Sequence, residues 1–99
     1  MKAEKFEATL MSGHKEDAAE VPFDPGERWS MRPLALWAGR KGFPVCATLN
    51  GAAFESAIVA RSKRFWLLVP AAIEESTGTT KGDVAAFTVA PNLAFKPTA

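Results

Sequence analysis

The sequence predicts a mainly β domain with short helices, in which two similar halves of one chain close a single barrel. Three observations support this fold class. An Asn-Gly pair separates two apolar runs, which is the strongest short signal for a β-hairpin. Two strand-like segments each end in Val-Pro before a short helical segment. Short motifs of the first half return in the second half, in the same order.

Length and composition predict one domain over residues 1–99 with one modest core, since the chain has 99 residues of which 47% are hydrophobic. The formal net charge of +1 at pH 7 gives no whole-protein support to a nucleic-acid partner. No segment reaches the roughly 20 apolar residues that cross a bilayer. The N-terminus lacks the apolar run of a signal peptide. We therefore expect a cytoplasmic protein without a membrane partner.

The first half begins with a strand at residues 6–10 and a hairpin turn at residues 12–14. A second strand ends at Val21-Pro22. Asp24 before Pro25 predicts a helix start, because aspartate is a favoured N-cap and proline fits the first helical position. A loop around residues 28–39 then leads to a strand at residues 43–49.

The second half follows directly from the Asn50-Gly51 turn. We expect its second hairpin near residues 61–63. Pro70 suits the first position of a helix over residues 71–77, and Gly78 is a natural C-terminal cap. The expected strands cover residues 52–59, 65–69 and 84–89. Residues 91–99 contain two prolines and are expected to form an exposed tail.

The repeat can be aligned residue by residue. Residues 6–10 (FEATL) resemble residues 54–58 (FESAI), and Val-Pro follows both at the same spacing, which gives an offset of 48. Lys-Gly heads a strand at residues 41–42 and again at 81–82, an offset of 40. Residues 5–49 and 54–89 are therefore predicted to superpose about a pseudo-twofold axis, with the first half longer.

These motifs also carry a resemblance to known families. Residues 69–87 (VPAAIEESTGTTKGDVAAF) resemble an element of the AbrB/MazE-type swapped-hairpin barrels. The chain from about residue 5 to 90 is similar to the bacterial DUF1905 family, through its FEATL, VPFD, LNG and KGD segments. The resemblance implies a double-split β-barrel of two swapped-hairpin halves capped by short helices. It implies no activity, and residues 31–37 lengthen the first-half loop beyond the family pattern.

Residues for catalysis or metal binding are scarce. His14 is the single histidine and lies in a polar turn. Cys46 lies within a strand without a basic neighbour to lower its thiol pKa, so it is expected to be a small buried apolar residue. No glycine-rich phosphate motif precedes a helix. We predict no catalytic residue, no metal and no cofactor.

Two surfaces are predicted to bind a ligand or a partner. Trp29, Arg32, Trp37 and Arg40 in the long first-half loop are assigned to a ligand or partner surface, the alternative being that the large residues cap the core. Arg61, Lys63 and Arg64 form a basic hairpin tip for an anion or nucleic acid, the alternative being a solvated turn.

The resulting hypothesis is a non-enzymatic small barrel that binds a small molecule or a protein partner, as a monomer or weak dimer. The alternative is a nucleic-acid-binding transcriptional regulator or antitoxin-like protein of the AbrB/MazE kind. Only one of the two expected hairpin tips is strongly basic, which predicts weak nucleic-acid binding.

Overall fold

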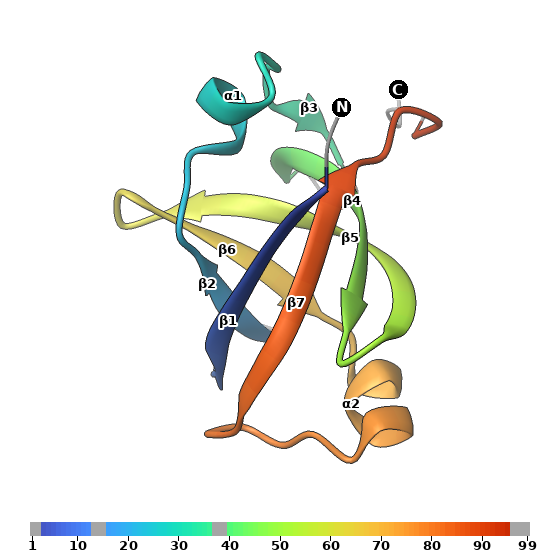
Figure 1. Ribbon diagram of the computed structural model, residues 1–99. Helices are drawn as coiled ribbons and strands as arrows, with labels where there is room; N and C mark the ends of the chain where they lie inside the picture. Colours follow the sequence, from blue (N-terminus) through green and yellow to red (C-terminus); the bar gives the residue numbers. More distant parts are fainter. Residues whose placement is uncertain (1–2, 13–15, 37–39, 96–99) are drawn as a thin grey trace.

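The computed structural model describes residues 3–12, 16–36 and 40–95. These residues form seven strands and two helices (Figure 1). In chain order, the elements are β1 (Glu4–Met11), β2 (Asp17–Val21), α1 (Pro25–Arg28), β3 (Leu34–Ala35), β4 (Lys41–Leu49), β5 (Ala52–Arg61), β6 (Arg64–Val69), α2 (Ala71–Thr77) and β7 (Val84–Pro91).

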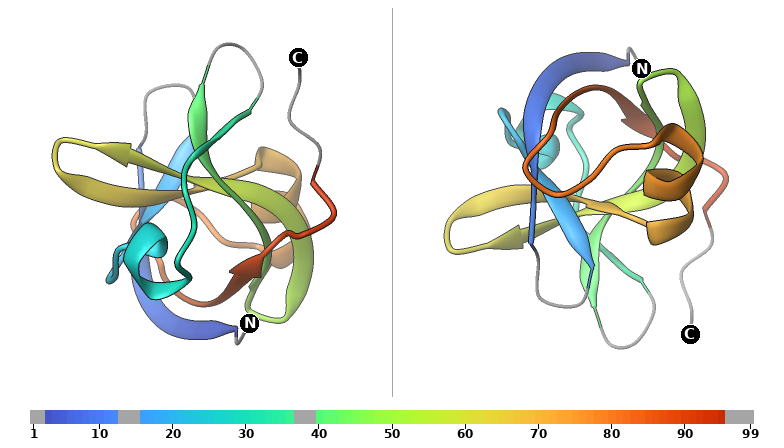
Figure 2. Two further views of the ribbon diagram at one scale, coloured as in Figure 1. Left: turned by 90° about the horizontal axis from the view of Figure 1, so that it is seen from above. Right: turned by 90° about the horizontal axis from the view of Figure 1, so that it is seen from below.

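Six of the strands close an antiparallel barrel in the order β4-β5-β6-β2-β1-β7, because β7 pairs back onto β4. The short strand β3 is added to the beginning of β4. Views along the barrel show α1 at one end and α2 at the other (Figure 2). The predicted mainly β barrel with short helices is thus confirmed.

The two hairpin turns of the second half follow from backbone conformation. Asn50 and Gly51 have φ values of 49° and 91°, as the predicted Asn-Gly turn requires. The Asn50 side chain also accepts a hydrogen bond from the Ala86 N–H at 2.9 Å, which attaches this turn to β7. Ser62 and Lys63 form the β5–β6 turn with φ values of 54° and 63°.

The observed start of α1 agrees with the sequence prediction, whereas that of α2 differs from it. The Asp24 side chain accepts hydrogen bonds from the Gly26 and Glu27 N–H groups, so it caps α1 as predicted. Pro70, however, is the N-cap of α2 rather than its first helical residue. Its ψ of 145° continues the extended backbone of β6, which delays the helix to Ala71. Gly78 ends α2 with φ 68°, as expected.

The strand registers of the two halves are equivalent. In the β1–β7 ladder, Phe6 lies opposite Phe87. Adding 48 to the first number and subtracting 40 from the second gives Phe54 opposite Ala47, which is an observed β4–β5 pair. All six pairs of the β1–β7 ladder correspond in this way to β4–β5 pairs.

The same offsets also relate the two paired strands within the β2–β6 ladder and within the β4–β7 ladder, through which a twofold axis would pass. Ala19 is opposite Leu67 in the middle of the β2–β6 ladder, and these residues are 48 apart. Thr48 is opposite Thr88 in the β4–β7 ladder, and these are 40 apart. The pairing of the strands therefore has the twofold relation that the repeat predicts.

The barrel is filled by side chains that alternate inward along the strands. Phe87 stacks on Phe6 with ring centroids 5.5 Å apart. The fully buried aliphatic residues around them are Leu10, Val45, Leu49, Ile58, Leu67, Val69 and Val89. At the α1 end, Phe23 and Met31 pack against this core, and at the α2 end Ile73 does so. The two ends are thus closed by side chains.

The C-terminal segment is held more firmly than an exposed tail. β7 extends to Pro91, and Asn92 is only 9% exposed. The Asn92 N–H donates to the Pro44 carbonyl, and its side-chain amide donates to Glu55. Leu93 is 72% exposed. The predicted exposure of residues 91–99 is therefore wrong for Asn92, which is buried, and Pro91 is the half-buried last residue of β7.

Candidate functional site

The residues assigned to the first-half loop surface do not share one surface. Trp29 is 4% exposed and belongs to the core, where its ring meets Phe23 edge-on at 5.5 Å. The core-cap alternative is therefore correct for Trp29. Arg32 is exposed. Arg40 forms an ion pair with Glu16 at 2.6 Å. Trp37 lies outside the described residues.

The residues examined for catalysis and metal binding are also dispersed. Cys46 is exposed rather than buried, because strand alternation turns it to the outer face between the buried Val45 and Ala47. His14 lies outside the described residues. Within residues 3–12, 16–36 and 40–95, no three potential metal ligands come together.

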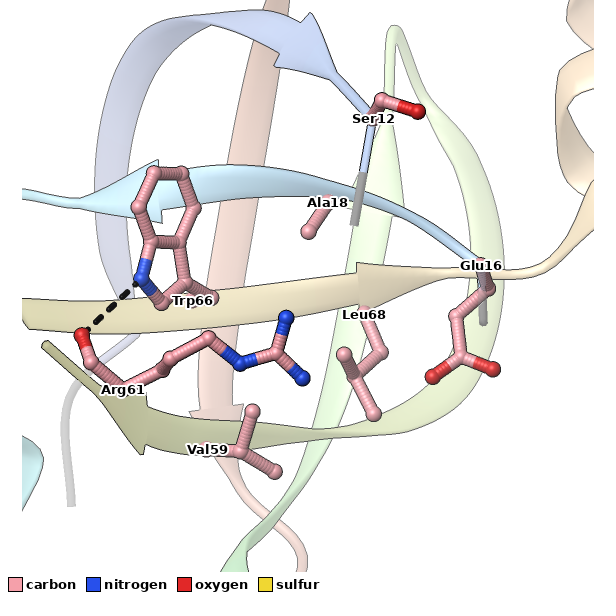
Figure 3. Close-up of a pocket in the computed structure, with 7 residues that line it drawn as sticks. All are labelled: Ser12, Glu16, Ala18, Val59, Arg61, Trp66 and Leu68. Atoms are coloured by element: carbon pink, nitrogen blue, oxygen red, sulfur yellow. Dashed lines mark hydrogen bonds between the residues drawn. The ribbon is translucent and has the colours of Figure 1, made fainter. Parts of the chain in front are cut away.

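The basic tip is solvent-exposed at the β5–β6 turn, as its sequence suggests. Arg61, Lys63 and Arg64 are all exposed. Arg64 forms an ion pair with Glu20 at 3.4 Å. Arg61 turns from the tip along the outer face of the barrel, where it reaches a pocket (Figure 3).

This pocket is the best-formed candidate site, and we call it the Trp66 pocket. Its volume is about 140 Å³. Its lining combines an apolar floor, an indole wall and polar groups at its edges: Ala18, Val59, Leu68, Trp66, Arg61, Glu16 and Ser12 (Figure 3). Because Leu67 and Val69 face the core, Trp66 and Leu68 face outward.

A difference in residue size between the two halves explains the pocket. Ala18 lies opposite Leu68 in the β2–β6 ladder. The repeat offset of 48 makes Ala18 the counterpart of Trp66. The small side chain of Ala18 leaves space beside Leu68 that a second indole would fill. The sequence analysis did not predict this pocket, although the unequal sizes of the repeat counterparts Ala18 and Trp66 were an available signal.

The two charged residues that line the pocket differ in whether they have an ion-pair partner. The Trp66 indole N–H donates to the Arg61 carbonyl at 3.3 Å, which orients the ring. Glu16 is paired with Arg40, and their side chains are 33% and 20% exposed. Arg61 has no carboxylate within 4.0 Å among the described residues. The pocket therefore presents a guanidinium available for an incoming anion.

A second, wide-open hollow lies between the start of β2 and α2, with a volume of about 470 Å³. Asp17 and Glu74 both line it. Desolvation by burial is the main cause that raises the pKa of Glu74 to about 7, and a hydrogen bond with Asp17 and repulsion from its charge act in the same direction. Glu74 therefore keeps its proton to a higher pH than an ordinary glutamate, which distinguishes this hollow from the Trp66 pocket with its Arg61 guanidinium.

Comparison with known proteins adds a family but no activity. No helix in the described part of the chain has the length and apolar character needed to cross a membrane. A search of curated proteins found no match. The family described as a domain of unknown function, DUF1905, matches residues 6–89, from the first barrel strand to the last. The chain therefore belongs to the DUF1905 family, and it is a small β-barrel member of it.

Proposed function

We propose that this protein is a non-enzymatic binding module whose Trp66 pocket takes a small monoanion with a single apolar ring or branched chain. The supporting observation is the placement of the Arg61 guanidinium at an apolar pocket, without a carboxylate within 4.0 Å among the described residues. The volume of about 140 Å³ is close to that of cavities that hold one benzene molecule, roughly 150 Å³. A single ring is thus the expected size limit.

The lining suggests how such a ligand lies. Its apolar part would contact Ala18, Val59 and Leu68 and stack against Trp66. Its carboxylate would pair with Arg61, since a guanidinium matches a carboxylate in geometry. Glu16 lines the same pocket and disfavours a second negative charge. We therefore expect monoanions to bind better than neutral analogues, and cations to bind least.

A titration followed by amide NMR shifts tests this function, with benzoate, benzamide and benzylamine as probes of one ring size. Benzoate should bind best. Arg61→Gln should weaken benzoate about ten-fold, the scale of a lost hydrogen bond to a charged group. Ala18→Leu should block all three probes by filling the pocket. Lys63→Gln is the control, because it removes an equal charge at the same tip but outside the pocket lining.

The outcome that contradicts the function is equal binding of the three probes, or an equal effect of Arg61→Gln and Lys63→Gln. Either result would show general surface attraction rather than a pocket. We place this activity in the cytoplasm and in a monomer or weak dimer. The closed barrel supports a monomer, because closure removes most of the strand edges through which chains associate.

The alternative function is nucleic-acid binding of the AbrB/MazE kind through the basic tip. Its support is the exposure of Arg61 and Lys63 on a projecting hairpin. Arg64 weakens this alternative, because Glu20 already neutralises it. Phosphate binding gains with each cation that is available, so a tip with two such residues favours weak binding.

A further inference from the structure

The barrel wall is incompletely paired between β1 and β2. Among the described residues, the two strands share the pairs Leu10–Ala19 and Met11–Ala18, and they separate from there toward α1 (Figure 1). An open groove of about 320 Å³ occupies this separation. Its lining is Glu7, Ala8, Thr9, Met11, Glu20 and Pro22. We call it the β1–β2 split.

The backbone of β1 directs hydrogen-bonding groups toward this split. The Leu10 N–H donates to the Asp83 carbonyl and the Leu10 carbonyl accepts from the Gly82 N–H, so Leu10 faces the β7 side. Successive residues of a strand alternate in direction. Thr9 and Glu7 therefore direct their N–H and C=O groups toward β2. The Thr9 carbonyl belongs to the hydrogen bonds that flank the Leu10–Ala19 pair, whereas Glu7 has no ladder partner on the β2 side among the described residues.

The second half shows how the equivalent position can be closed. There, the Ser56 hydroxyl donates to the Leu68 carbonyl at 2.6 Å, between β5 and β6. The offset of 48 makes Ala8 the counterpart of Ser56, and Glu20 the counterpart of Leu68. Alanine has no hydroxyl to donate. The bridge present in the second half is thus lost in the first half, where the groove lies.

We propose that the β1–β2 split binds an extended segment of a partner protein, which adds as a strand to the edge of β1 and carries a basic side chain. Backbone groups that alternate along a strand edge match those of another extended peptide. Glu7 and Glu20 are the charged residues of the lining, and they favour lysine or arginine in the occupant. The basic side chain of the occupant would compete with Arg64 for Glu20, since these two residues already pair at 3.4 Å.

This site is separate from the Trp66 pocket, and its occupation does not require the function proposed above. The test is an amide NMR titration of the whole chain with the blocked pentapeptide acetyl-Thr-Val-Lys-Val-Thr-amide. The largest shifts should fall on Glu7, Thr9 and Glu20. The same peptide with its strand-pairing amides N-methylated should not bind. A peptide with glutamate in place of lysine should bind more weakly.

Two reciprocal substitutions use the repeat as an internal control. Ala8→Ser installs the hydroxyl that the second half has, and should weaken peptide binding about ten-fold by occupying the Glu20 carbonyl. Ser56→Ala removes the bridge of the second half, and should produce a second set of peptide shifts on β5 and β6. Thermal unfolding of both variants verifies that the barrel is intact.

The proposal is overturned if millimolar peptide causes no shifts, if the shifts centre on Trp66 or the basic tip, or if neither substitution changes them. Equal binding of the N-methylated peptide overturns it as well, independently of any variant. Self-association of the chain that Ala8→Ser abolishes would show that a second copy occupies the split, and would also overturn assignment to a partner protein.

Discussion

Gly42 is the position where one added methyl group should most disturb this barrel. A Cβ at Gly42 would lie 2.5 Å from the Ile58 carbonyl oxygen, and 3.0 and 3.1 Å from Leu36 and Val59. The carbonyl belongs to the backbone of the paired strand β5, so it cannot move aside as a flexible side chain would. Overpacking of this kind typically costs 1–3 kcal/mol. We expect Gly42→Ala to lower the free energy of unfolding by about 3 kcal/mol.

Gly82 supplies the matched control, because the offset of 40 makes it the repeat counterpart of Gly42. Its φ is 100°, and a Cβ there would meet nothing within 4 Å. Gly82→Ala therefore tests backbone conformation alone, and should cost about 1 kcal/mol. The two repeated Lys-Gly pairs thus serve different purposes: close approach of strands at Gly42, and a turn at Gly82.

Urea and thermal unfolding measure both variants. A loss of about 3 kcal/mol in a domain of this size should lower the Tm by about 12–24 °C. Adding Leu36→Ala to Gly42→Ala should not restore stability, since the carbonyl clash remains. A loss below about 1 kcal/mol, or full rescue by Leu36→Ala, would refute the steric reasoning.

Three further predictions concern charge and capping. The folded-state pKa of Glu74 is raised to about 7 from 4.5, so its contribution to stability is complete below pH 4.5 and is lost as the pH rises to about 7. The urea midpoint of unfolding should therefore fall between these two pH values. Glu74→Gln should make this fall smaller. Asp24→Ala removes the cap of α1 and should lower the free energy of unfolding by about 1 kcal/mol in the same assay. Labelled duplex DNA should bind only weakly and lose affinity with salt; nanomolar, sequence-dependent binding at physiological salt would instead favour the regulator hypothesis.

Local conformation and the internal repeat were determined by the sequence itself. The turn at Asn50-Gly51 and the cap at Asp24 depend on neighbouring residues only, so both could be predicted without knowledge of the fold. The repeat offsets of 48 and 40 also anticipated the strand registers, because two equivalent halves of one barrel must pair equivalently. Pro70 shows the limit of local rules, since the extended backbone of β6 decided where α2 begins.

The sites were decided by tertiary structure. Trp29 and Trp66 both lie near basic residues in the sequence, yet barrel closure buries Trp29 in the core and leaves Trp66 on the outer face. The Trp66 pocket and the β1–β2 split depend on contacts between residues far apart in the chain, Ala18 with Leu68 and Ser56 with Leu68. Such spaces arise where a small residue of one half takes the place of a larger or hydrogen-bonding residue of the other. Periodicity indicates which face a residue lies on, whereas only the closed barrel shows what lies across from it.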